Sequence, residues 1–215
     1  MEEAEGFWRV PALWPDGECY ILGGGPSLAK IDIESLRGRR VIAVNQAFKL
    51  APWIDVMFYG DCRWLNQYSH GLLDFAGLKV TTCPQHVKKQ WIRVVRRKSR
   101  PFGISRDPGY LSWNLSSGAC AINLAVHFKV KRIILLGFDM RKIDGRCNYH
   151  DDYERPVRPR GKDPYRRFLG PFGEIAADLD RMNIKCVNAT PGSALKEFPI
   201  ISPSELGITT LEEQK

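Results

Sequence analysis

Short, uninterrupted apolar runs, each ending in a turn or a glycine-rich break, constrain the fold of this sequence more than any other feature. An unbroken run is typical of a strand that is covered on both faces, as in a parallel sheet flanked by helices. Helical spacing of apolar residues lies between the runs, at Ala119–Phe128 and Phe172–Met182. This alternation predicts an α/β, doubly wound architecture and leaves the strand order open. The runs are Cys19–Leu22, Val41–Val44, Val56–Tyr59, Lys79–Thr82, Ile133–Leu136 and Ile184–Val187.

The length of 215 residues suits one domain with a well-filled core. We expect this domain to span residues 1–206. A long, basic stretch at about 141–167 lacks the spacing of a helix or strand and is predicted to be a lid loop. Residues 207–215 are predicted to form a flexible tail.

The balance of charge and apolar content limits the class of partner. Lys and Arg number 32 against 24 Asp and Glu, and the net charge of +8 favours an anionic partner such as a nucleotide, a nucleic acid or an acidic sugar. No stretch reaches the roughly 20 apolar residues of a membrane span, and the first residues are acidic where a signal peptide is basic. We therefore expect a soluble, cytoplasmic protein, with its oligomeric state left open.

The six cysteines stand far apart, with no C-x-x-C pair. This spacing argues against a zinc site, and a disulfide framework is not expected in a cytosolic chain of this size. We therefore expect the cysteines to be reduced and mostly buried. They are at positions 19, 62, 83, 120, 147 and 186.

The first predicted strand ends in three glycines, Gly23, Gly24 and Gly25, followed by Pro26 and Ser27. Glycines leave room for a ligand beside the backbone, and free amides at a strand-to-helix turn can bind phosphate. The loop is neither the G-x-G-x-x-G fingerprint nor a P-loop, because it lacks the third glycine and the lysine. Its place after the first strand favours nucleotide or phosphate binding over the alternative, an ordinary tight turn.

Polar residues also follow the second and third predicted strands. The carboxyl ends of strands in an open sheet are where ligands bind, so Asn45 and Gln46 are placed to bond a base or a ribose. The alternative for Asn45 is to cap the next helix. Asp61 would accept a substrate hydroxyl and assist catalysis, or it would cap the helix that begins near Arg63.

Three further segments place polar groups beside strands or helices. Ser116, Ser117 and Gly118 open the Ala-rich helix, either as an ordinary N-cap or as a second helix terminus facing a phosphate. Asp139 follows the most apolar strand and is included in the candidate nucleotide site. The segment Asn188–Leu195 places polar groups at the carboxyl end of the last strand, and it is equally consistent with an ordinary turn.

His150 is the histidine with the most polar surroundings, in a loop beside Asp151 and Asp152. A neutral imidazole can take a proton from an attacking hydroxyl, and a nearby carboxylate raises its basicity, so His150 is the candidate general base. The alternatives are a solvated loop histidine or a divalent metal site formed with the two aspartates. Asp178 and Asp180, the only D-x-D pair, are predicted to lie on the solvated face of a helix.

The segment Lys88–Arg106 is strongly basic and includes Trp91 and Phe102. Basic residues with interleaved aromatic rings can bind nucleic acid, through the phosphates and through stacking on the bases. The alternative is a solvated basic surface.

The glycine loop, the Asn-Gln pair, the Ser-Gly turn and the Asp139 segment follow one another along the chain. Their order resembles that of the motifs in the bacterial sialyltransferases of glycosyltransferase family forty-two. They are also similar to the MptE-like hydroxymethylpterin diphosphokinases and to small prophage-encoded proteins. The resemblance runs from about residue 20 to residue 206. It implies a Rossmann-like, mostly parallel sheet with flanking helices and a lid. The matching residues are Gly23, Gly25, Pro26, Ser27, Asn45, Ser117 and Gly118, with His150 as the nearest candidate base.

The resemblance to the sialyltransferases implies a CMP-sialic acid donor, held by the glycine loop and Asn45, and a histidine base in the lid. Tyr149, Tyr153 and Tyr165 are candidates for the family's phosphate-contacting tyrosines. One departure is Gly24, where the family has an asparagine. We therefore expect a metal-independent glycosyltransferase with a CMP-type or other nucleotide-sugar co-substrate and no tightly bound cofactor.

Three alternatives stay open. A magnesium-dependent diphosphotransferase of the MptE-like kind would hold its metal with Asp61, Asp139, Asp151 or Asp152. A phage DNA-modifying transferase would use Lys88–Arg106 to contact DNA. A non-catalytic phage accessory protein would keep the fold without the chemistry.

Overall fold

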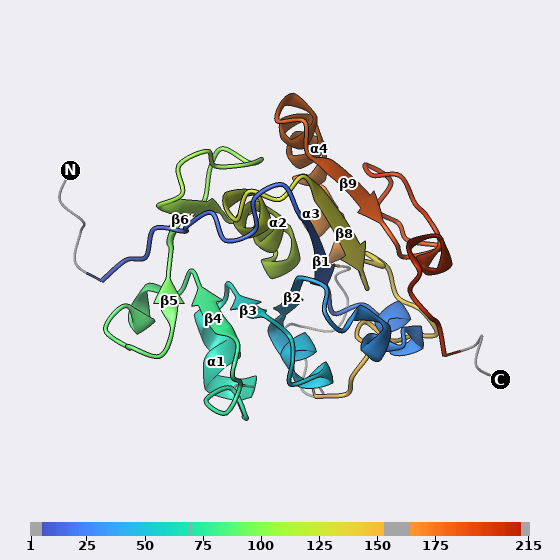
Figure 1. Cartoon of the computed structure of the whole chain (residues 1–215), viewed down its shortest axis with the longest axis horizontal. Helices are drawn as coiled ribbons and strands as arrows, with labels where there is room; N and C mark the ends of the chain where they lie inside the picture. The colour runs from blue at the N-terminus through green and yellow to red at the C-terminus, as the bar shows by residue number, and fades with distance from the viewer. Residues whose placement is uncertain (1–5, 69, 153–163, 212–215) are drawn as a thin grey trace.

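The structure is a computed structural model that describes residues 6–68, 70–152 and 164–211. At its centre lies a seven-stranded sheet in which each neighbouring pair of strands is parallel (Figure 1). All six apolar runs form strands, with bounds shifted by one residue at most, so the predicted Rossmann-like α/β fold is confirmed. In sheet order the strands are β5 (Arg93–Val94), β4 (Leu78–Thr81), β3 (Val56–Tyr59), β2 (Val41–Val44), β1 (Glu18–Leu22), β8 (Arg132–Leu136) and β9 (Lys185–Asn188).

The two predicted helices are confirmed as α2 (Ser117–His127) and α4 (Phe172–Arg181). The other helices are short and have no sustained apolar spacing, so the sequence did not define their bounds, although it indicated a helix near Arg63 as one alternative. No helix among the described residues is both long enough and apolar enough to cross a membrane. The short helices are α1 (Cys62–Tyr68), α3 (Tyr165–Leu169) and the 3-10 helices η1 (Pro26–Lys30), η2 (Ile33–Leu36), η3 (Asn45–Leu50), η4 (Pro84–His86) and η5 (Pro203–Leu206).

The central strand β1 shows why its sequence is continuously apolar. Cys19 and Ile21 pack into one core with α2 and α4, and Tyr20 and Leu22 pack into a second core on the opposite face of the sheet. All four side chains are at most 1% exposed. Because helices or loops cover both faces of the sheet, the side chains on both sides of the strand are buried, and a run of apolar residues results.

The strand order creates a switch point between β1 and β8. After β1 the chain builds β2, β3, β4 and β5 outward on one side, and it later returns to place β8 and β9 on the other side (Figure 1). The connections that leave the carboxyl ends of β1 and β8 therefore diverge and leave a crevice. In open parallel sheets this crevice is the usual ligand site.

The basic segment Lys88–Arg106 contributes β5 and β6 (Arg96–Lys98), and β6 pairs with β7 (Tyr110–Ser112) in a separate two-stranded sheet. Its cations lie over the protein's own aromatic rings, including Lys89 over Trp91 at 5.6 Å and Arg100 over Phe102 at 3.8 Å. Both aromatic rings proposed to stack on bases are therefore already in contact with a cation.

The chain after Leu206, which is expected to be a flexible tail, packs on the protein as far as the described residues extend. Ile208 is 1% exposed, Thr210 pairs with Ile31 in an antiparallel bridge, and the amide of Leu211 donates to the carbonyl of Lys30 at 2.8 Å. One buried apolar side chain among polar neighbours was too weak a signal to predict this.

The predicted solvated face of α4 needs a correction at Asp178. Its Oδ2 accepts a hydrogen bond from the amide of Ile104 at 2.7 Å, and its Oδ1 pairs with Arg181. Asp178 thus anchors the loop before β7, whereas Asp180 is exposed as predicted. Helical spacing alone cannot reveal a distant backbone amide that approaches the polar face.

Candidate functional site

A cavity of about 510 Å³ lies at the carboxyl end of the sheet, where the loops after β1, β2, β3 and β8 converge. This volume is within the range of small-ligand sites. Of the predicted site residues, Pro26, Ser27, Gln46 and His150 do not line it. The other nine do: Gly23, Gly24, Gly25, Asn45, Asp61, Ser116, Ser117, Gly118 and Asp139.

The glycine loop packs tightly against the loop after β8. The amide of Gly23 donates to the carbonyl of Leu136 and the amide of Gly25 to the carbonyl of Gly137, both at 2.8 Å. A Cβ at Gly25 would collide with Asp139 and lie 2.7 Å from the carbonyl oxygen of Gly137. These two amides thus bond within the protein instead of forming the expected phosphate cradle. The helix that follows, η1, is a five-residue 3-10 helix without a full α-helical terminus.

Gly24 differs from its two neighbours. A Cβ at Gly24 would meet one described atom within 4 Å, Oδ1 of Asn148 at 3.5 Å. The carbonyl of Gly24 accepts the amide of Tyr149 at 3.1 Å, and both Gly24 and Asn148 line the cavity. The segment around Asn148 therefore covers the middle of the glycine loop.

Asp139 is a buried carboxyl in the cavity wall, 1% exposed. Its Oδ2 accepts two hydrogen bonds from Ser27, from Oγ at 2.9 Å and from the amide at 3.3 Å. Its Oδ1 is buried with no hydrogen-bond partner among the described residues. Burial raises the pKa of Asp139, and the bonds from Ser27 offset this only in part. Ser27 thus does not line the cavity itself but holds Asp139 in place through these hydrogen bonds.

Asn45 begins η3 with a φ of +54°, a left-handed conformation that asparagine tolerates better than most residues. Its side chain does not cap the helix, and its buried Oδ1 has no partner in the described parts of the chain. Gln46 is 2% exposed, and its Oε1 is also without a partner there, but Gln46 does not line the cavity. Only Asn45 of this pair faces the site.

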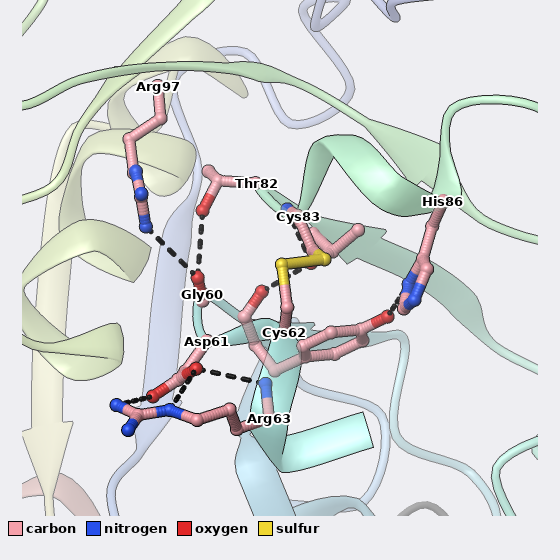
Figure 2. The surroundings of a disulfide bond; sticks show 10 residues. Gly60, Asp61, Cys62, Arg63, Thr82, Cys83, His86 and Arg97 are labelled. Atoms are coloured by element: carbon pink, nitrogen blue, oxygen red, sulfur yellow. Dashed lines mark hydrogen bonds and ion pairs between the residues drawn. A yellow bond between two sulfur atoms is a disulfide. The ribbon is translucent and has the colours of Figure 1, made fainter. Parts of the chain in front are cut away.

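Asp61 immediately precedes α1 and lines the cavity, so its position is compatible with both predicted roles. Its Oδ1 accepts the amide of Arg63 at 3.0 Å, and its Oδ2 pairs with the Arg63 guanidinium at 3.2 Å (Figure 2). Burial acts to raise the pKa of Asp61, but the bonds from Arg63 and the charges of Arg63 and Arg97 outweigh it and lower that pKa. The group is therefore a carboxylate at neutral pH, suited to accept a bond from a substrate hydroxyl.

The Ser-Ser-Gly turn forms the predicted N-cap, and its place in the cavity lining is compatible with the other interpretation, a helix terminus that faces a phosphate. Ser116 is the N-cap of α2, and its Oγ accepts the amide of Ala119 at 3.2 Å. The Oγ of Ser117 accepts the amide of Gly60 at 3.2 Å. Both serines and Gly118 line the cavity. A hydroxyl that accepts one bond can still donate its hydrogen to a ligand.

His150 lies outside the cavity lining. Its Nδ1 accepts the amide of Asp152 at 3.2 Å, and its ring packs edge-on against Tyr149 at 4.7 Å. Burial lowers the pKa of His150, and the charges of Lys49 and Arg146 add to this, although the carboxylates of Asp151 and Asp152 act to raise it. The imidazole is therefore neutral at neutral pH, as a base must be. Its role as the base remains a prediction.

Several lining residues were missed by sequence reasoning. They come from α1, from the turn before α2, from the loop after β8 and from α3, all segments without a strong periodic signal. Arg167 lies within the predicted basic lid, and the hydroxyl of Tyr165 donates to the carbonyl of Cys147 at 3.1 Å. Tyr153 lies outside the described residues. The missed residues include Arg63, Trp64, Gln67, Trp113, Asn148, Arg167 and Phe168.

The expectation that all six cysteines are reduced is wrong for one pair. Cys62 and Cys83 form a disulfide with a Cα–Cα distance of 5.2 Å (Figure 2). Their 21-residue separation hides the fact that they follow neighbouring strands, β3 and β4, whose carboxyl ends lie side by side. The other four cysteines are free, and three of them are buried as predicted.

The carboxylates proposed for a magnesium site do not cluster. Asp151 pairs with Arg146 at 2.7 Å, and Asp152 pairs with Lys49 at 3.2 Å. Of the aspartates considered, Asp61 and Asp139 line the cavity and the other two do not. Within residues 6–68, 70–152 and 164–211, no three His, Cys, Asp or Glu side chains are grouped so as to hold a metal ion.

The chain is similar in structure to the sialyltransferase CstII from Campylobacter jejuni, solved in complex with cytidine-5'-monophosphate. The two share 18% identity over 88% of this chain and 86% of that one, with a TM-score of 0.53. A second CstII structure, in complex with a trisaccharide acceptor and CMP, gives 17% identity over 86% of each chain and the same TM-score. No protein-family model and no curated protein matches the sequence. These comparisons show that the chain has a sialyltransferase-like fold.

Proposed function

We propose that this protein is a nucleotide-dependent transferase, and specifically a metal-independent glycosyltransferase that uses a CMP-type nucleotide-sugar donor. The proposal is supported by the position of the cavity at the sheet's switch point and by the fold shared with CstII, which was solved with CMP. It also fits the net charge of +8, which favours an anionic substrate.

The observation that carries the proposal is a pair of buried oxygens on two residues that line the cavity. Oδ1 of Asn45 and Oδ1 of Asp139 have no hydrogen-bond partner among the described residues, and both residues line the cavity. A buried acceptor without a partner costs about 1–3 kcal/mol. Ribose hydroxyls and the exocyclic amino group of cytosine are donors that would satisfy such acceptors.

The charges around the cavity suggest how a donor would be oriented. The Asp139 carboxyl disfavours a phosphate beside it, which leaves the nucleoside for that end. Arg63 and Arg167 also line the cavity, and a guanidinium is suited to the charge that develops on a departing phosphate. In this proposal Asp61 accepts a bond from a substrate hydroxyl, and His150 removes the proton of the attacking hydroxyl.

Calorimetric titration with CMP, CDP and AMP tests the proposal. We expect CMP and CDP to bind wild-type protein in the presence of EDTA. We expect Asn45→Ala and Asn45→Gly to lose about tenfold in affinity, the effect of one hydrogen bond to a polar ligand. The glycine variant is the control, because it keeps the left-handed backbone without the amide. If wild-type protein binds none of these nucleotides, the proposal is wrong.

A further inference from the structure

The Cys62–Cys83 disulfide is attached to the wall of the cavity. Cys62 is the first residue of α1 and follows Asp61, which lines the cavity (Figure 2). Three residues of α1 line it as well: Arg63, Trp64 and Gln67. The bridge therefore joins the segment that presents four lining residues to the loop after β4.

The two segments that the disulfide joins differ in how firmly other contacts hold them. Cys83 is fully buried, and its amide donates to Oγ1 of Thr81 at 3.1 Å. The next turn is held as well, since the hydroxyl of Tyr59 and Nδ1 of His86 share a buried hydrogen bond of 2.7 Å. The loop after β4 is thus fixed without the sulfur atoms.

The α1 half depends more on the bridge. A helix of seven residues is far shorter than the roughly 12–15 residues that an isolated helix needs, so packing must hold it. Trp64 and Leu65 are its buried anchors, at 6% and 9% exposure, and Trp64 contacts Tyr59 at a ring distance of 4.9 Å. Cys62 is the third attachment, at the N-terminal end of the helix, between Asp61 and Arg63 in the chain.

The glycine loop on the opposite side of the cavity is held by contacts that involve no cysteine. The glycine loop is held by the backbone bonds from Gly23 to Leu136 and from Gly25 to Gly137, and by the bonds from Ser27 to Asp139. A change in the bridge would therefore act on the α1 side of the cavity alone.

We propose that the Cys62–Cys83 disulfide positions Asp61 and Arg63 in the cavity wall, so that ligand affinity depends on the redox state of this pair. The ligand part of this inference rests on the proposed function. Cys62 is a partly exposed residue and Cys83 is fully buried, so we expect an external thiol to attack the sulfur of Cys62. A thiolate of an external dithiol attacks it and releases the Cys83 thiolate, which takes up a proton. The second thiol of the reagent then closes the reagent's own disulfide and releases the Cys62 thiol, so two electrons pass from the dithiol to the protein.

Hydrogen exchange read by mass spectrometry tests the positioning role directly. Air-oxidised protein and protein treated with dithiothreitol are compared, with the bridge confirmed by a mass gain of two hydrogens. We expect exchange over residues 62–68 to rise at least about tenfold on reduction, as for a segment that opens locally, and residues 23–28 to be unchanged. Equal exchange over 62–68 in the two states, or six free thiols in the air-oxidised protein, would overturn the proposal.

Calorimetry with CMP adds the functional readout. We expect reduction to weaken CMP binding about tenfold, as for the loss of one charged hydrogen bond. The Cys62→Ser/Cys83→Ser double variant should bind CMP like reduced wild type and should not respond to dithiothreitol. A response that persists in this variant would assign the effect to another cysteine and refute the proposal. Equal CMP affinity of oxidised and reduced wild type would refute it as well. If oxidised wild type binds no CMP, the proposed function fails, while the exchange experiment still decides the positioning role.

Discussion

The hydroxyl of Ser27 donates to Oδ2 of Asp139 at 2.9 Å, although 112 residues separate them in the sequence. Ser27 follows the glycine loop after β1, and Asp139 follows β8, so the bond spans the switch point of the sheet. It fixes one oxygen of the Asp139 carboxyl and leaves the other, Oδ1, without a partner among the described residues. The part of the cavity wall that Asp139 forms therefore depends on a contact between two loops.

Replacing Ser27 with alanine should weaken this contact. Asp139 would lose the hydroxyl of Ser27 as a donor and keep its amide, and we expect the free energy of unfolding to fall by about 1–2 kcal/mol, as for other hydrogen bonds to charged or buried groups. Urea denaturation measures this change. Ser99→Ala, at an exposed position, is the control. A Ser27→Ala protein as stable as this control would show that the bond is not needed.

The pH dependence of stability should reveal the buried Asp139. Burial raises its pKa in the folded state, so the folded protein binds more protons than the unfolded chain above the ordinary carboxyl pKa of about 3.9. This contribution to stability is complete below that value and is lost as pH rises through the folded pKa. We expect Asp139→Asn to lack this loss, so that its melting temperature gains on wild type with rising pH. A constant difference between the two proteins would contradict the raised pKa.

Substitution by alanine should destabilise the protein at Gly25 but not at the adjacent Gly24. At Gly25 a Cβ would collide with Asp139, and we expect Gly25→Ala to cost about 1–3 kcal/mol of stability through overpacking. At Gly24 the nearest described atom would be Oδ1 of Asn148 at 3.5 Å, so Gly24→Ala should fold normally. Chemical denaturation of both variants tests this. Equal stability of the two would refute the close approach of the loops.

Substitution of His150 separates binding from chemistry. If His150 is the base, His150→Gln should lower the rate of CMP release from a CMP-linked sugar by about 10²–10⁴-fold. CMP affinity should stay the same, because His150 does not line the cavity. The lowered pKa places the acidic limb of the wild-type rate below the ordinary imidazole value of about 6.5, with the rate rising as pH increases through it. An unchanged rate in the variant would exclude this role.

The sequence was most informative where burial on both faces left no choice of residue type. The runs that form β1, β2, β3, β4, β8 and β9 could be located to within one residue. The two-residue β5 and the basic β6 carry no such signal, because they are short and are not buried along their whole length. Local pattern cannot specify an edge strand of this kind.

For the candidate site, the sequence predicted which residues meet at the cavity better than it predicted the contacts that each one makes. Residues placed after strands, such as Asn45, Asp61 and Asp139, do converge on one cavity, because parallel strands end at the same edge of the sheet. The bonds of the Gly23 and Gly25 amides could not be predicted, since their partner carbonyls on Leu136 and Gly137 lie more than 100 residues away. The proximity of Cys62 to Cys83 was hidden because the pairing of β3 with β4 could not be read from the sequence.

The segment that ends at Leu211 has a consequence for synthesis of the protein. The amides of Asp32 and Leu211 donate across to the carbonyls of Thr209 and Lys30, which fastens the stretch just after the glycine loop. On the ribosome these bonds cannot form until residue 211 has emerged from the exit tunnel. A nascent chain that already contains both sides of the crevice would therefore still lack part of its support, and its ligand pocket should mature only after residues 209–211 have left the tunnel.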